Sequence, residues 1–256
     1  MKKLDSIIIT TLLFLMALNV NANEEYISSG DTKNAVIELY TSEGCSSCPP
    51  AEAWLSQTGR LEQYPEAELI PLAFYVDYWD YLGWKDPYAH PDYSMRQKMH
   101  QINGGIRSLY TPQLILNAKE LRPARTLPTR FAQERSSKAS LQLDLRVTTQ
   151  ADSLQVNLKS LPLKANLSND DGVYFAVTEN NIVSSINAGE NHGRTLTHDY
   201  VVREFIGPLK IDITQDSIVD QLIKINPDWN LDEIAVVAFV QTMKGEILQA
   251  VRWSNK

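Results

Sequence analysis

The chain contains the stretch Gly44-Cys45-Ser46-Ser47-Cys48-Pro49-Pro50, which closely follows an apolar, strand-like segment. Cys45 and Cys48 are the only two cysteines among its 256 residues. Two thiols separated by two residues can close a small disulfide ring or bind one soft metal ion. Because there is no third cysteine, neither thiol is available for a long-range structural disulfide within the chain. The stretch therefore predicts a local redox or metal function for the pair.

The first residues indicate the compartment in which this pair works. Lys2 and Lys3 precede a nearly continuous apolar stretch from Ile7 to Val20, and Ala22 is a small residue at a suitable cleavage position. This pattern is typical of a secretory signal peptide, here residues 1–22, cut after Ala22. The apolar core is shorter than the roughly 20 residues that a membrane anchor needs. We therefore expect a periplasmic or secreted protein with no stable membrane association after cleavage.

The charge of the remaining chain narrows the range of partners. Removal of the signal peptide takes away Lys2, Lys3 and Asp5, which changes the formal net charge from −7 to −8. An acidic chain is poorly suited to binding nucleic-acid phosphates, so no nucleic-acid partner is expected. Disulfides persist in exported compartments, yet one Cys-x-x-Cys pair does not staple a chain of this length. The composition thus favours a redox or metal role for the two thiols.

Two patterns of side chains divide the rest of the sequence. Over residues 34–138, short apolar runs alternate with helical stretches, which predicts an α/β domain. Over residues 139–256, apolar and polar side chains alternate instead, for example from Leu141 to Val147. A period of two residues is typical of half-buried antiparallel strands. An all-β, sandwich-like second domain is the economical assembly of such strands.

The position of the cysteines at a strand-to-helix turn bears on their reactivity. We expect a helix from Pro50 to Arg60, directly after the pair. Unpaired N–H groups and the positive end of a helix dipole stabilise a thiolate, so Cys45 is predicted to have a lowered pKa. Cys48 is expected to be the more buried of the two. The two adjacent prolines are tolerated only in the first helical turn, and they fix the helix start near the cysteines.

A second element is Thr111-Pro112, which lies just before a strand expected at Leu114 to Asn117. A cis-proline at such a place exposes the preceding backbone to a bound, extended peptide. The strand–turn–helix context of the cysteines favours this cis form over an ordinary trans proline. We therefore predict a cis bond that lies within van der Waals reach of the cysteines.

An insertion rich in aromatic and acidic residues spans residues 77–110. It is longer than a minimal crossover between two strands requires. One interpretation is a lid or substrate platform, with Trp79 and Trp84 beside the cysteines. The other is a helical cap that packs on the core.

Longer segments resemble a known family. These segments are Ile37 to Glu52, Val76 to Pro87, Tyr110 to Gln113, and Gly193 to His198 with Val201 to Arg203. Together they resemble the secreted thioredoxin-like proteins of the domain of unknown function 1223, over nearly the whole mature chain. The resemblance implies an α/β thioredoxin-like domain followed by the all-β domain, in an exported protein. It implies little about activity, because a fold does not establish a function.

The resemblance to thioredoxins implies roles for candidate catalytic residues. Cys45 resembles the attacking cysteine and Cys48 the resolving one, while Pro112, preceded by Thr111, resembles the cis-proline that faces them. Glu38 is similar to the buried acid that helps to deprotonate the resolving thiol. An acid in an otherwise apolar strand either has a raised pKa or contacts an arginine, a lysine or a water channel behind Cys48.

These observations predict a thiol–disulfide oxidoreductase that acts on a protein or a small thiol. No cofactor and no resident metal are expected, because the four histidines show no metal-binding spacing. Two alternatives stay open. One is a copper(I)-handling protein that uses the same thiols as ligands, and the other is a non-enzymatic binding module.

Overall fold

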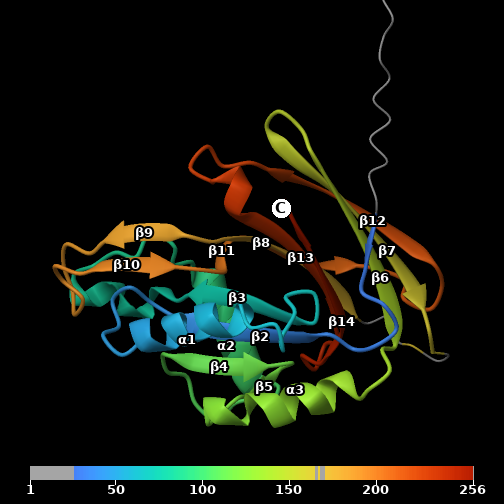
Figure 1. Ribbon diagram of the computed structural model, residues 1–256, viewed down its shortest axis with the longest axis horizontal. Coiled ribbons are helices and arrows are strands. Elements are labelled where there is room, and N and C mark those ends of the chain that lie inside the picture. Colours follow the sequence, from blue (N-terminus) through green and yellow to red (C-terminus); the bar gives the residue numbers. More distant parts are fainter. Residues whose placement is uncertain (1–25, 165–166, 168–170, 256) are drawn as a thin grey trace, which may run out of the picture.

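The computed structural model describes residues 26–164, 167 and 171–255 as a mixed α/β protein in which strands predominate (Figure 1). The predicted signal peptide, residues 1–22, lies outside the described residues. Within the described ranges, no helix is long and apolar enough to cross a membrane.

The main sheet has eight strands in the order β14-β13-β8-β11-β3-β2-β4-β5. In chain order they are β2 (Ala35–Thr41), β3 (Leu69–Tyr75), β4 (Gln113–Leu116), β5 (Lys119–Glu120), β8 (Gly172–Glu179), β11 (Val201–Lys210), β13 (Ile234–Gln241) and β14 (Ile247–Ser254). β3 runs parallel to both β2 and β11, and the other neighbouring pairs are antiparallel. The sheet therefore continues through both segments that the sequence pattern separates at residue 138.

A second sheet covers one end of the first. Its order is β1-β6-β7-β12, formed by β1 (Ile27–Ser28), β6 (Leu141–Thr149), β7 (Ser153–Pro162) and β12 (Ser217–Lys224). The alternating leucines of β6 and β7 are buried against apolar residues of β8 and β13, such as Phe175 and Val236. The predicted period-two strands are thus confirmed, and they form a sandwich-like pair with strands of the main sheet.

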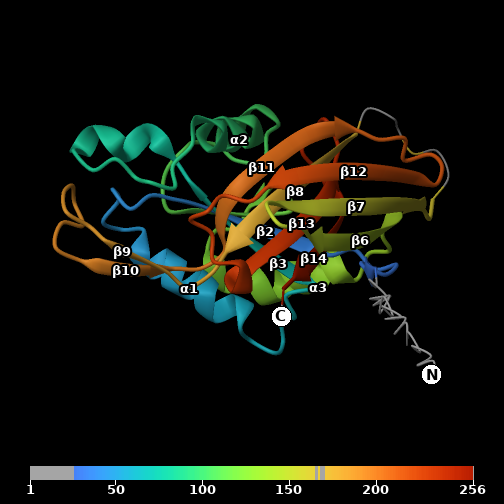
Figure 2. The same cartoon turned by 90° about the horizontal axis from the view of Figure 1, so that it is seen from above.

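Helices cover both faces of the other end of the main sheet (Figure 2). α1 (Pro49–Gly59) and α3 (Leu127–Arg135) pack on the face that receives Ile37 and Leu39 of β2. α2 (Pro91–Ile102) packs on the opposite face, which receives Val36 and Tyr40. The alternation of side chains along β2 therefore decides which helix each of its residues contacts.

The insertion at residues 77–110 forms the 3-10 helix η1 (Asp77–Leu82) and α2. Two further 3-10 turns are η2 (Ala124–Thr126) and η3 (Leu231–Glu233). The segment from Thr195 to Phe205 does not form one strand but is divided into β10 (Thr195–His198) and the start of β11. The break follows from Tyr200, whose φ of 59° is left-handed and incompatible with a continuous strand. β10 pairs with β9 (Ile182–Ser185) in a separate two-stranded hairpin.

Candidate functional site

Cys45 and Cys48 form a disulfide at the amino end of α1. Their Cα atoms lie 5.4 Å apart. Cys48 is the residue that caps α1, and Pro49 and Pro50 occupy its first two positions. The predicted helix start and the place of the prolines are therefore confirmed, and the pair closes the small disulfide ring that its spacing allows.

Both cysteines are buried. Cys45 is 2% exposed and Cys48 is 0% exposed, whereas the two serines between them lie at the surface. The order of burial agrees with the prediction, but the difference is small. In this disulfide form, a partner thiolate must approach the attacked sulfur along the axis of the S–S bond, so the burial of Cys45 requires the loop or its cover to move before exchange.

The backbone N–H groups at the start of α1 are largely used or missing. Pro49 and Pro50 have none. The N–H groups of Ala51 and Glu52 both donate to the carbonyl oxygen of Cys48, at 2.9 Å and 3.1 Å. Few donors are therefore left at this helix end to stabilise a thiolate. The helix start thus stabilises a Cys45 thiolate less than the sequence predicts.

A loop from the distant β9–β10 hairpin holds the cysteine loop in place. Asn191 is buried, and its Nδ2 donates to the carbonyl oxygens of Glu43 and Cys45, at 2.8 Å and 3.0 Å. The backbone N–H of Ser46 donates to Oε2 of Glu190 at 2.9 Å. The cysteine loop is thus fixed by residues that follow it by more than 140 positions in the chain.

The Thr111-Pro112 bond is cis, as predicted. The register Tyr40↔Gln113 between β2 and β4 brings Pro112 to the end of β2 from which the cysteine loop departs. Trp79 joins the two segments, since its Nε1 donates to Oγ1 of Thr111 at 2.7 Å and its Cβ would lie 3.3 Å from a side chain at Gly44. The insertion therefore borders the site through Trp79, while the reach of Pro112 to the cysteines stays a prediction.

Trp84 also lies at the site. Its Nε1 donates to Oε2 of Glu43 at 2.7 Å. Tyr81, by contrast, is 78% exposed and stacks on Trp79 with the ring centroids 6.4 Å apart. The insertion thus supplies the indole of Trp84 to the site and a stacked pair of aromatic rings, Trp79 and Tyr81, near its surface.

Glu38 does not face α1. It shares the β2 face of Val36 and Tyr40, and it is paired with Arg96 of α2 through bonds of 2.7 Å and 2.8 Å. His100 Nε2 and the hydroxyl of Tyr40 also contact this carboxylate. Burial by itself would raise the pKa of Glu38, but the charges and hydrogen bonds of Arg96 and His100 together outweigh burial and hold that pKa far below its usual value. Of the two expectations for Glu38, the arginine contact is confirmed and the raised pKa is wrong.

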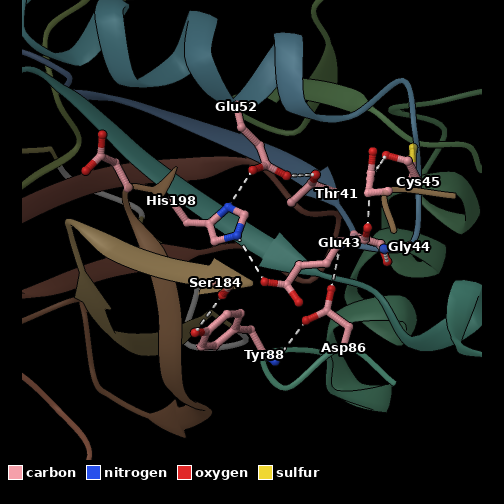
Figure 3. Close-up of polar contacts among 12 residues, drawn as sticks. Thr41, Glu43, Gly44, Cys45, Glu52, Asp86, Tyr88, Ser184 and His198 are labelled. Atoms are coloured by element: carbon pink, nitrogen blue, oxygen red, sulfur yellow. Dashed lines mark hydrogen bonds and ion pairs between the residues drawn. The ribbon is translucent and has the colours of Figure 1, made fainter. Parts of the chain in front are cut away.

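Another group of buried residues lies on the side of the sheet where α1 packs. His198 Nδ1 lies 2.7 Å from Oε2 of Glu52, and its Nε2 lies 3.0 Å from Oε1 of Glu43 (Figure 3). The hydroxyl of Thr41 donates to the other oxygen of Glu52. His198 is 0% exposed, and it therefore bridges the loop before Cys45, helix α1 and strand β10 in the interior. We call Glu43, Glu52 and His198 the buried triad.

The two contacts determine the charge of His198. Burial by itself would lower the pKa of this imidazole, but the hydrogen bonds to Glu43 and Glu52 raise it to about 9. For Glu43, burial by itself would raise the pKa, but the hydrogen bonds of this carboxylate with His198, Ser184 and Trp84 hold its pKa below the usual value. At neutral pH, His198 is thus a cation beside the ionised Glu43.

Asp86 adds a second carboxyl group to this interior. Its oxygens accept the N–H groups of Glu43 at 2.7 Å and Tyr88 at 2.9 Å. Burial, supported by the charge of Glu43, raises the pKa of Asp86 to about 7. The interior beside the cysteine loop therefore contains one group, Asp86, that exchanges a proton near neutral pH.

The buried triad was not predicted from the sequence. Glu52 and His198 both lie in segments that resemble the family, but they are 146 positions apart and nothing in the sequence pairs them. Two signals were available: all three residues lie in those segments, and Glu43 and Glu52 are acids on either side of the cysteines, close to a predicted helix start. Among the described residues, no group of three or more His, Cys, Asp or Glu has the arrangement of a metal site.

The chain belongs to DUF1223, a family of proteins of unknown function, whose model matches residues 36–241. No curated protein matches it. A crystal structure of a protein from Agrobacterium tumefaciens is similar, with 20% identity over 88% of this chain and 96% of that one, at a TM-score of 0.58. HBP35 of Porphyromonas gingivalis is also similar, with 15% identity over 88% of this chain and 76% of that one, at a TM-score of 0.69. At these identities the likeness shows the fold alone.

Replacing Glu38 with Gln tests the structural role of this acid. The variant leaves the buried Arg96 without its counter-charge, so we expect a loss of about 3–5 kcal/mol in the free energy of unfolding, measured by urea titration. Reduction and reoxidation of Cys45 and Cys48 should keep their wild-type rates from pH 6 to 9 in the folded fraction. Glu134→Gln, at a pair with Lys33 nearer the surface, is the control. Slower exchange with unchanged stability would contradict this assignment.

The buried triad predicts a pH dependence of stability. Because the pKa of His198 is about 9 in the folded chain and about 6.5 unfolded, its contribution is complete below pH 6.5 and is lost as the pH rises through 9. We expect the unfolding free energy of the disulfide form to fall by on the order of 3 kcal/mol over this range. His198→Gln should be less stable at pH 6.5 and should show a flatter profile above it. An unchanged slope in this variant would show that other groups cause the loss.

Proposed function

We propose that this member of the DUF1223 family is an exported thioredoxin-like thiol–disulfide oxidoreductase that acts on a protein or small-thiol partner. One observation carries the proposal: Cys45 and Cys48 form a disulfide at the start of α1, at the sheet end that also bears the cis bond before Pro112. The order β2, α1, β3 with parallel strands, followed by the antiparallel β4, supports the thioredoxin-like part of the proposal. The apolar stretch within residues 1–22 supports export.

In the proposed reaction, the reduced pair transfers two electrons to a partner disulfide. The thiolate of Cys45 attacks one partner sulfur, an S–S bond forms between the two molecules, and the other partner sulfur leaves as a thiolate. Cys48, after losing its proton, then attacks the sulfur of Cys45. The second partner thiolate leaves, and the chain returns to the disulfide form that the structure describes. The reverse sequence oxidises a partner dithiol.

We assign the buried triad a positioning role in this reaction. Glu43 lies two residues before Cys45 and Glu52 lies four residues after Cys48, and His198 joins their side chains. The triad therefore fixes the two ends of the cysteine loop relative to each other. Asp86, whose pKa is about 7, binds the N–H of Glu43 and adds a group that can release or take up a proton near neutral pH.

Single-cysteine variants test the proposed exchange. Cys48→Ser leaves Cys45 able to attack but prevents resolution, so disulfide-linked adducts should accumulate in the exported compartment. Cys45→Ser should give few adducts, and the double variant is the control. Non-reducing gels followed by mass spectrometry identify the partners.

The other outcomes of this experiment decide between the alternatives. If Cys48→Ser gives no adducts and the reduced wild type binds one more copper(I) than the double variant, the thiols are metal ligands instead. In that case both single variants should lose copper equally, because the two thiolates are equivalent ligands. If neither adducts nor copper bound through the thiols is found, the oxidoreductase proposal fails and the chain is a binding module.

The contact between Glu190 and the N–H of Ser46 predicts an effect on Cys45. A carboxylate at this loop opposes formation of a nearby thiolate, so Glu190→Gln should lower the pKa of Cys45 in the reduced chain by a few tenths of a unit. The thiolate absorbance of Cys48→Ser as a function of pH measures it. Glu62→Gln, beyond the opposite end of α1, is the control for net charge. The difference should shrink at high salt, and a raised pKa in Glu190→Gln would be the opposite of this expectation.

A further inference from the structure

The methionines of the described chain gather at one place. The full sequence has five methionines, and three of them, Met95, Met99 and Met243, lie in the described residues. All three line one pocket of about 280 Å³ between α2 and the turn that joins β13 to β14. This pocket lies on the α2 side of the main sheet, opposite to the face on which α1 packs.

The side chains of these three methionines are not buried in the hydrophobic core. Met95 is 54% exposed, Met99 is 42% exposed and Met243 is 75% exposed. Methionine is ordinarily one of the residue types most often buried. The three thioethers are therefore accessible to a ligand, and burial in the core does not explain them.

The three side chains come from two elements that are held together. Met95 and Met99 are four residues apart on α2, which places them on one side of the helix. Asn103, a further four residues along, donates from Nδ2 to the carbonyl oxygen of Met243 at 3.4 Å. The turn containing Met243 is thus attached to the same side of the helix end.

A second link fixes this turn against α2. Nη1 of Arg96 donates to Oε1 of Gln241 at 3.2 Å, and Nε2 of Gln241 donates to the carbonyl oxygen of Gly245 at 2.6 Å. Gly245 also donates its N–H to Thr242, which closes the turn. The position of Met243 relative to Met95 and Met99 is therefore supported by buried hydrogen bonds rather than by a free loop.

The charged residues that line this pocket do not repel a small cation. Arg96 lines the pocket, but Glu38 neutralises it through a bidentate ion pair. Asp92 adds a carboxylate at the rim. A monovalent cation could therefore enter without meeting an uncompensated positive charge.

Thioethers are neutral, soft ligands that favour copper(I) over the hard divalent ions. Two ligands at a spacing of four residues on one helix, completed by a ligand from a neighbouring segment, form a recurrent metal-binding arrangement. We propose that Met95, Met99 and Met243 form a copper(I) site that is separate from the cysteine pair. No electron transfer is involved, because the ion binds and leaves as copper(I).

This proposal does not depend on the oxidoreductase function. In the disulfide form the sulfurs of Cys45 and Cys48 are bonded to each other, so they provide no thiolate ligand. A site made of thioethers keeps its ligands whether that pair is oxidised or reduced. The test can therefore be made on a chain without any thiol.

The experiment uses the mature chain carrying Cys45→Ser and Cys48→Ser. Copper(I) is titrated anaerobically against a chromophoric copper(I) chelator, and silver(I) serves as a redox-inert substitute. We expect one bound ion per chain and shifts in the ε-methyl NMR signals of all three methionines. Met95→Leu, Met99→Leu and Met243→Leu should each weaken binding by at least about ten-fold, as the loss of a ligand requires. The triple variant should abolish it.

Leucine preserves the volume and the apolar character of methionine, so these variants should fold normally. Ile102→Leu, at an exposed position of the same helix, is the matched control and should bind as the parent does. Absence of copper(I) and silver(I) binding overturns the proposal, and so does binding that survives in the triple variant. If an apolar peptide shifts the same methyl signals while neither ion does, the pocket is a peptide-docking surface and the metal assignment is wrong.

Discussion

The contact of His198 with Glu43 and Glu52 is the interaction on which the arrangement of the site depends. Two buried carboxylates beside a cysteine loop are costly without a positive charge, and an imidazole between them supplies it. Glu43 belongs to the loop before Cys45, and Glu52 belongs to the helix after Cys48. The geometry of the loop therefore depends on a residue that reaches the site only when β10 has been placed.

This dependence explains why residues 34–138 and 139–256, which differ in sequence pattern, do not form two separate structural units. β8, β11, β13 and β14 extend the sheet begun by β2 and β3, and β11 lies directly beside β3. Asn191 and Glu190 then reach back from the hairpin loop to the cysteine loop. The family match over residues 36–241 also spans both segments, because it includes the cysteines and the hairpin that holds them. We infer that the first segment alone would lack the interactions that fix the cysteine loop.

The local features of the site were predictable from the sequence because local chemistry produces them. Two prolines after Cys48 can only begin a helix, and Pro112 before a strand at the same sheet end fits a cis bond. Glu38 was located correctly in a buried strand, but a period of two does not reveal which face of a sheet a strand residue meets. Its partner Arg96 lies 58 positions away, and His198 lies 146 positions from Glu52. Pairings over such separations arise from the tertiary fold, and one sequence carries no signal of them.

The surroundings of Cys45 also bear on the direction in which electrons move. A strongly oxidising pair needs a reduced form stabilised as a thiolate, usually by free N–H groups and nearby positive charge. Here two prolines remove N–H donors, the carbonyl of Cys48 takes the next two, and Glu190 places a carboxylate at Ser46. Each of these contacts disfavours a thiolate at Cys45 and so favours the disulfide. Under the proposed function, we infer that the site is better suited to giving electrons to a partner disulfide than to oxidising a partner dithiol, and that it would need a separate source of electrons to be reduced again.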